Sequence, residues 1–206
     1  MSANNSQAQS ASKKVDVRYL TVTAMLSAIA FVLMYLDFSI PMLIPSFVKM
    51  DLSELPAIIG SFAMGPLCGV LVCLIKNLLH CFVSTTGFVG EASNFVLGVA
   101  FVLPAGLIYK AKKTKKNALI GSLIGSVAMA VISYPSNLFI MYPLYYNFLP
   151  EEAVLGMYQA ILPSVKSVAQ AILIFNCPFN LVKCLLSVVV TMLTYKKLSP
   201  ILKGNK

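Results

Sequence analysis

Six apolar stretches, separated by short polar segments, run along most of the chain. Five approach or exceed the length of about 20 residues that an α-helix needs to cross a bilayer. The second is shorter and ends at Gly65-Pro66. The pattern therefore predicts an all-α integral membrane protein folded as a six-transmembrane-helix bundle. The predicted segments are 19–36, 52–64, 66–83, 91–109, 117–146 and 168–195.

Composition supports a membrane location and frames the domain organisation. Hydrophobic residues make up 58% of the 206 positions and charged residues only 11%, whereas soluble domains carry about 25% charged residues. We expect a multi-pass protein of the cell membrane. The sequence predicts a disordered, cytoplasmic N-terminal tail over 1–18, a six-helix membrane domain over 19–197 and a cytoplasmic C-terminal tail over 198–206.

The distribution of charge predicts the orientation of the bundle. Lysine and arginine accumulate in cytoplasmic segments, and with six crossings the three basic clusters fall on one side. Both termini are therefore expected in the cytoplasm, and the net charge of +9 follows from topology and gives little support to nucleic-acid binding. The clusters are Lys13, Lys14 and Arg18; Lys110, Lys112, Lys113, Lys115 and Lys116; and Lys196, Lys197, Lys203 and Lys206.

Polar residues within the apolar segments are candidates for a ligand site, because ionisable and amide groups are costly at membrane depth. Asn176, Asn180 and Lys183 are spaced i, i+4, i+7 and form one polar stripe on a helix. With the predicted topology, Asn94 and Asn137 also lie towards the outer end, as does the loop Lys49-Met50-Asp51. Amides offer both donors and acceptors, so this convergence predicts a pocket for a polar, uncharged or weakly charged ligand.

Structural roles remain open for the same residues. Asparagines also hold membrane helices together, and a buried lysine could simply pair with Glu91. Lys76 lies one helical turn from His80 on the same face, and a structural role is favoured for both. Ala24 and Ala28 form a small-xxx-small step on the first helix. That step permits close helix approach, either within the bundle or to a separate membrane subunit.

Motifs of enzyme chemistry are missing from the sequence. It contains no GxxxxGK[ST] phosphate loop, no HExxH and no GxSxG motif. Because His80 is the single histidine, a metal site is improbable. We therefore expect no catalytic residues, no metal and no cofactor.

Five short motifs stand out along the chain from about residue 19, most densely over 47–110. They are K-x-D-x-S-x-x-P from Lys49, G-P-x-x-G from Gly65, K-N-x-x-H from Lys76, G-E-x-x-N-F from Gly90 and NCPFNLVK from Asn176. Together they resemble the riboflavin-specific substrate-binding subunit, or S component, of energy-coupling-factor (ECF) vitamin transporters.

The resemblance implies a six-helix bundle that binds riboflavin from outside as the transported ligand. A transmembrane coupling subunit and two cytoplasmic ATPases would supply the energy, with Ala24 and Ala28 as the docking surface. The loop over 37–51 would cover the ligand. Asn137, Asn180 and Lys183 match positions that contact the flavin in relatives. The full candidate ligand-binding set is Asn94, Asn137, Asn176, Asn180, Lys183, Glu91, Lys49, Met50 and Asp51.

Two alternatives stay open at this stage. The same scaffold could bind another vitamin or FMN. A protein of another class, a small membrane-bound enzyme or a stand-alone channel, is the second alternative. A channel should show a continuous polar path through both halves of the bundle, whereas the polar residues here are concentrated in the outer half.

Overall fold

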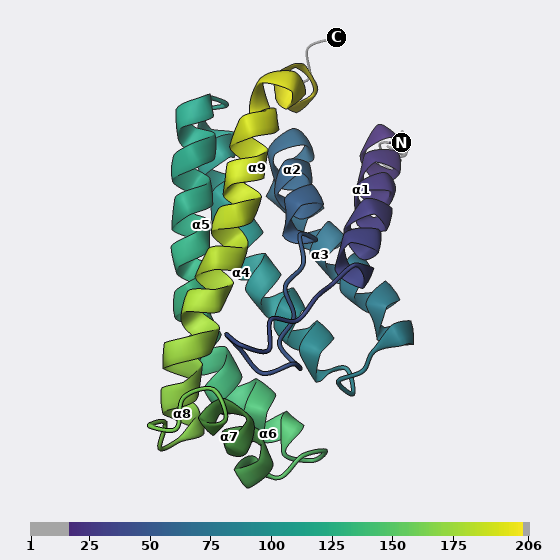
Figure 1. Ribbon diagram of the computed structural model, residues 1–206. Helices are drawn as coiled ribbons and strands as arrows, with labels where there is room; N and C mark the ends of the chain where they lie inside the picture. Colours follow the sequence, from purple (N-terminus) through teal and green to yellow (C-terminus); the bar gives the residue numbers. More distant parts are fainter. Residues whose placement is uncertain (1–16, 204–206) are drawn as a thin grey trace, which may run out of the picture.

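The computed structural model describes residues 17–203, which are helical apart from the connecting loops and turns (Figure 1). No β-strand occurs in this range; one isolated antiparallel bridge joins Phe38 and Met50. The all-α prediction is confirmed. The elements are α1 (Val17–Tyr35), α2 (Glu54–Met64), α3 (Pro66–His80), η1 (Cys81–Val83), α4 (Val89–Ala111), α5 (Lys115–Ser136), η2 (Asn137–Met141), α6 (Tyr142–Tyr145), α7 (Glu151–Gln159), α8 (Val168–Ala171), η3 (Ile172–Asn176) and α9 (Cys177–Lys203).

The predicted N-terminal tail falls almost entirely outside the described residues, which exclude 1–16 and 204–206. Helix α1 begins at Val17 and α9 continues to Lys203, so helical structure reaches into both predicted tails. The start of α1 and the end of α9 lie at the same end of the bundle (Figure 1).

Five helical stretches in the described part of the chain are long and apolar enough to cross a membrane: 17–35, 66–83, 89–111, 115–145 and 168–195. The short apolar helix α2 has 11 residues, or about 16 Å at 1.5 Å per residue. It occupies only the end of the bundle that also holds the start of α1 and the end of α9 (Figure 1). The structure therefore supports a multi-pass membrane protein, with α2 as a shorter inner element.

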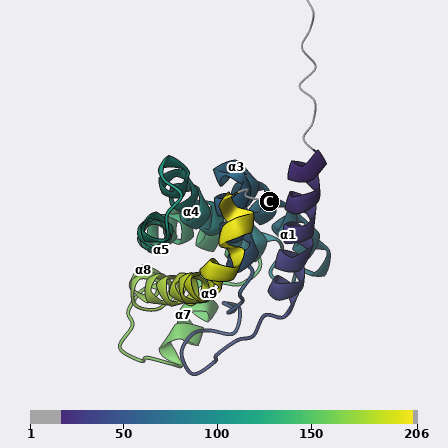
Figure 2. The same cartoon turned by 90° about the horizontal axis from the view of Figure 1, so that it is seen from above.

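Small residues bring the central helices together. A Cβ atom built on Gly125 of α5 would lie 2.3 Å from the Phe101 carbonyl oxygen of α4, and one built on Gly121 would lie 2.8 Å from that of Ala105. Only glycine allows this approach. Figure 2, a view along the bundle, shows α4 and α5 side by side with α9 next to them and α1 at the opposite side.

Two long helices each contain a π-helical turn close to a proline. Segment η2 precedes Pro143 within 115–145, and η3 precedes Pro178 within 168–195. Proline has no N–H group to donate to the preceding turn, and π turns are often found at functional sites. Asn137 and Asn176 lie in these turns, so the irregular backbone coincides with the predicted site.

Helix α1 packs through one face and exposes another. Thr23 and Ser27 are buried, and the Thr23 Oγ1 atom lies 3.2 Å from the Sγ atom of Cys68 on α3. Ala24 and Ala28 are exposed in this subunit. The small-xxx-small step is therefore not used for close packing inside the bundle, which leaves it accessible to another helix.

Candidate functional site

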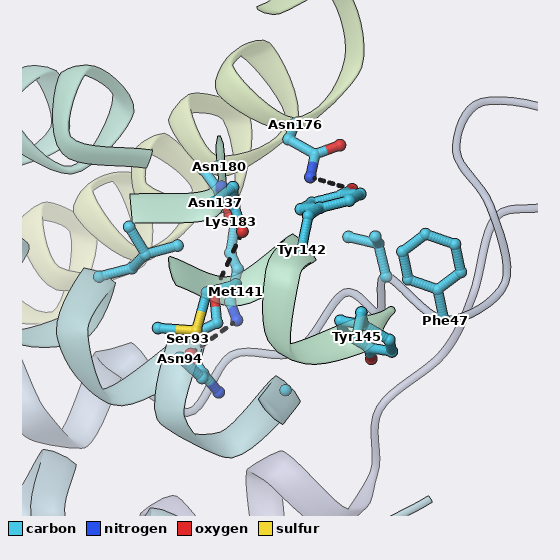
Figure 3. A pocket seen from close by; sticks show the side chains of 13 residues that line it. Phe47, Ser93, Asn94, Asn137, Met141, Tyr142, Tyr145, Asn176, Asn180 and Lys183 are labelled. Atoms are coloured by element: carbon cyan, nitrogen blue, oxygen red, sulfur yellow. Dashed lines mark hydrogen bonds between the residues drawn. The ribbon is translucent and has the colours of Figure 1, made fainter. Parts of the chain in front are cut away.

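A cavity of about 100 Å³ lies where α4, η2, α6, η3 and α9 converge under the loop over residues 36–53 (Figure 3). We call it the first cavity. It brings together five of the predicted site residues, from three long helical segments: Asn94, Asn137, Asn176, Asn180 and Lys183. The other lining residues are Phe47, Val48, Gly90, Ser93, Leu97, Met141, Tyr142 and Tyr145.

Asn137 and Asn180 are held through the same serine. Asn180 Nδ2 donates to Ser133 Oγ at 2.8 Å, and Asn137 Nδ2 donates to Ser133 Oγ at 3.1 Å and to the Ser133 carbonyl at 2.8 Å. Ser93 Oγ donates to Asn137 Oδ1 over a long 3.5 Å. In the described part of the chain Asn180 Oδ1 accepts no hydrogen bond. The pair thus offers amide oxygens to a donor on a ligand, with the amide orientation fixed by Ser133.

Lys183 joins the first cavity to the loop over 36–53. Its Nζ atom donates to Asp51 Oδ2 at 2.8 Å and to Asn94 Oδ1 at 3.4 Å, which leaves capacity for one further acceptor. Burial acts to raise the pKa of Asp51, but the nearby Lys183 and Lys76 charges and hydrogen bonds from Lys183 and Ser53 lower it to about 2. Asp51 is therefore ionised at neutral pH and fixes the position of the ammonium group.

Asn176 serves a different set of partners. Its Nδ2 atom donates to Tyr142 Oη at 3.0 Å, and its Oδ1 atom accepts from Tyr158 Oη at 2.7 Å. The hydroxyls of Tyr142 and Tyr158 also bond to each other. This triad ties α6 and α7 to η3, so the Asn176 amide is already used by the protein although it lines the first cavity.

Aromatic residues form one wall of the first cavity (Figure 3). The ring of Phe47 lies 5.6 Å from that of Tyr145 and 6.5 Å from that of Tyr142. Asn137, Met141 and Tyr145 are spaced i, i+4, i+8 and share a helical face. That spacing could have identified Met141 and Tyr145, whereas Phe47 lies in a loop without periodicity.

Four predicted site residues lie beside the first cavity rather than in its lining. Lys49 pairs with Asp37 at 3.0 Å, and Asp51 pairs with Lys183 as described above. Met50 is buried, with its backbone paired to Phe38. Glu91 Oε1 lies 2.8 Å from His80 Nδ1.

The suggested pairing of a buried lysine with Glu91 is wrong, because Glu91 pairs with His80 and the two buried lysines pair elsewhere. Lys76 Nζ lies 2.7 Å from Glu54 Oε1 and donates to Ser53 Oγ at 2.6 Å. Lys76 and Glu54 are both completely buried. The two pairs follow from where the carboxylates lie. Glu54 is the first residue of α2 and lies beside the middle of α3, whereas Glu91 lies at the start of α4, where His80 contacts it. Lys76 has a structural partner and does not line the first cavity.

A multi-pass helical bundle with a cavity of amide, ammonium and aromatic groups beneath a loop defines a membrane-embedded small-molecule-binding protein. Residues 18–195 match the family described as ECF transporter, substrate-specific component. The chain belongs to this family.

Individual relatives agree with the family assignment. The chain is 36% identical to the riboflavin transporter FmnP of Bacillus subtilis, over 90% of this chain and 94% of that protein. It is 34% identical to the riboflavin transporter RibU of Staphylococcus aureus, over 90% of this chain and 92% of that protein. A solved S component of a bacterial ECF transporter superposes with a TM-score of 0.70 at 34% identity, covering 90% of this chain and 98% of that one.

Proposed function

We propose that this chain is a riboflavin-binding S component of the cell membrane, which captures the vitamin from outside and delivers it with an ECF coupling module. The observation that carries the proposal is the first cavity, where Asn137, Asn180 and Lys183 face the aromatic wall of Phe47 and Tyr145. Relatives at 34% and 36% identity named as riboflavin transporters support the choice of ligand.

The chemistry of a flavin ring suits this cavity. An isoalloxazine ring is flat and apolar on its faces and carries carbonyl oxygens and an N–H group along one edge. Asn180 Oδ1 can accept from the N–H group, and Lys183 Nζ can donate to a carbonyl oxygen. Tyr145, Phe47 and Met141 can pack on the faces of the ring.

The loop over 36–53 must move for a ligand of this size. Drug-sized ligands occupy pockets of about 300–1,000 Å³, whereas the first cavity measures about 100 Å³. Phe47 and Val48 of the loop project into it. We infer that ligand binding displaces these two side chains outward and that the loop then closes over the ring.

We further propose six crossings with both termini in the cytoplasm. Lys110 and Lys113 line one cavity together with Tyr19, the residue after Arg18, so two of the basic clusters lie at the same end of the bundle, as expected for a cytoplasmic face. Helix α2 has 11 residues, so as the second crossing it would be tilted or would enter the membrane only part way. The loop before it, which contacts Lys183 through Asp51, lies on the outer side.

The coupling partner would be a membrane subunit that docks on α1. Ala24 and Ala28 are exposed, whereas Ala30 of the same helix is buried, and small exposed residues in a membrane favour close helix packing. The sequence carries no phosphate-binding loop, so ATP hydrolysis would have to come from two separate cytoplasmic ATPase subunits.

The absorbance spectrum of the protein purified from cells tests the ligand directly. We expect bands near those of free riboflavin, and extraction followed by mass spectrometry should release riboflavin. Purification in the presence of thiamine and biotin, with neither of them retained, is the control. Release of another vitamin would overturn the assignment.

A further inference from the structure

The cavity that Tyr19, Lys110 and Lys113 line has a volume of about 400 Å³, four times that of the first cavity. We call it the second cavity. It lies between the start of α1, the turn from α2 to α3 and the end of α4. The start of α1 and the end of α2 lie at one end of the bundle, whereas α6 and α7, beside the first cavity, lie at the other (Figure 1). Pockets for small molecules measure about 300–1,000 Å³, so the second cavity is large enough for a ligand of its own.

The charge around the second cavity is positive. Lys110 lies in the last turn of α4 and Lys113 just beyond it. Neither lysine forms an ion pair with another residue of the described range 17–203, and no carboxylate of that range lines the cavity. Helix α3 also begins here, with Pro66 as its first residue and Leu67 in the lining. The first N–H groups of a helix lack intrahelical partners and carry partial positive charge, so the second cavity suits an anion.

The remaining walls of the second cavity are apolar or have their polar atoms already bonded. Ser61 Oγ donates to the Val102 carbonyl at 2.9 Å, and the Tyr109 hydroxyl lies 3.2 Å from that of Tyr195. The rest of the α2 side of the lining is apolar and includes Phe62. A ligand that matches these walls has an anionic head and an apolar body.

The second cavity lies at the depth of lipid headgroups. The apolar helical stretch 89–111 ends beside it, and the next one begins at Lys115. Lysines at the ends of membrane-spanning helices lie at the boundary between the lipid chains and water. Basic pockets between membrane helices on the cytoplasmic side bind anionic lipid headgroups. The chemistry and the depth of this cavity therefore favour the same kind of ligand.

We propose that the second cavity binds the phosphate-bearing headgroup of an anionic phospholipid. Lys110 and Lys113 contact the phosphate, and Phe62, Met64 and Leu67 pack against the glycerol and the upper part of an acyl chain. In the orientation proposed above, this lipid belongs to the cytoplasmic leaflet. The inference goes beyond the proposed function and does not depend on which ligand occupies the first cavity.

The test measures binding of individual lipids to the full-length, detergent-purified protein by native mass spectrometry. Dioleoyl phosphatidylglycerol, which carries a net negative charge, is compared with dioleoyl phosphatidylcholine, which has the same chains and no net charge. Since each lysine near an anionic lipid surface strengthens the attraction by about fivefold, the wild-type protein should bind its first phosphatidylglycerol on the order of tenfold more tightly than phosphatidylcholine. The double variant Lys110→Gln/Lys113→Gln should lose most of this preference.

A matched variant separates the cavity from the general charge of the segment. Lys115→Gln/Lys116→Gln removes the same charge from exposed positions outside the second cavity, and it should keep the wild-type preference. Both double variants replace exposed side chains, so their thermal midpoints should match that of the wild-type protein.

Three results would overturn the inference. Equal loss of preference in both double variants would show that the basic segment attracts lipid without a specific site. Displacement of phosphatidylglycerol by excess inorganic phosphate would make the site one for free phosphate. An unchanged lipid preference in Lys110→Gln/Lys113→Gln, together with a loss of uptake into cells, would assign the cavity to the coupling subunit. Each of these results leaves riboflavin binding in the first cavity untouched.

Discussion

Lys183 on α9 forms a buried ion pair with Asp51, 132 positions earlier in the sequence, with 2.8 Å between Nζ and Oδ2. This pair places a loop residue against the floor of the first cavity. The same ammonium group also donates to Asn94 Oδ1 of α4 at 3.4 Å, so Lys183 connects the loop to α4 as well. The Asp51 end of the loop over 36–53 is thus held at the ligand site by charge, whereas Phe47 is held there by ring packing.

Acid should weaken the fold through Asp51. Its pKa is about 2 in the folded protein against an ordinary value of 3.8, so its stabilising contribution is complete above about pH 4 and is lost as the pH falls towards 2. We expect the thermal midpoint of the wild-type protein in detergent to drop over that interval. Asp51→Asn should be less stable at neutral pH and should lose less on acidification. Parallel pH profiles of the two proteins would contradict this role.

Removing either partner of the buried Lys76–Glu54 pair should destabilise the protein. Breaking a buried ion pair costs about 3–5 kcal/mol because one charge stays unpaired. Lys76→Met should therefore lower the thermal midpoint clearly. Lys76→Met combined with Glu54→Leu should recover a large part of the loss, because no charge is then left buried. A double variant no more stable than the single one would show that the packing around Ser53, not the charge, dominates.

Asn180 should contribute directly to ligand affinity. Loss of a hydrogen bond that leaves its partner unsatisfied costs about 1–3 kcal/mol, so Asn180→Leu should weaken riboflavin binding about 5- to 150-fold. The matched control is Asn77→Leu, since Asn77 is also buried but donates to the Cys73 carbonyl of its own helix and lies outside the first cavity. Equal riboflavin affinity of the two variants would indicate that Asn180 does not contact the ligand and has only a structural role.

A bulky substitution on the exposed face of α1 should abolish transport with the coupling subunit but leave riboflavin binding intact. Ala28→Trp adds a bulky side chain on an exposed face, so the isolated subunit should still bind riboflavin while uptake into cells falls sharply. Ala153→Trp, at an exposed alanine of α7, is the control and should leave uptake unchanged. Normal uptake by Ala28→Trp would place the docking surface elsewhere, and loss of binding would indicate that Ala28 packs within the subunit.

The lengths of the apolar stretches predicted the long helices well, because the length of an apolar segment decides whether it can span a bilayer. The stripe spacing of Asn176, Asn180 and Lys183 likewise placed all three at one cavity. It could not show that the Asn176 amide is occupied by Tyr142 and Tyr158, because those contacts depend on how α6 and α7 fold over the bundle.

Pairing between distant elements was the other part that sequence spacing could not predict. Lys76 and Glu54 meet because α2 starts beside the middle of α3. The sequence showed that α2 is short, but it did not show how far along α3 the start of α2 lies. Phe47 reaches the first cavity from a loop, and loops have no repeating geometry from which a side-chain position can be inferred.

A riboflavin titration of the flavin-free, detergent-purified protein tests the central claim most directly. Quenching of flavin fluorescence should saturate at one riboflavin per chain without ATP or any partner subunit, because the first cavity is built entirely from this chain. Excess thiamine or biotin should not displace the flavin. No binding at micromolar riboflavin, together with saturable binding of another vitamin, would contradict the account.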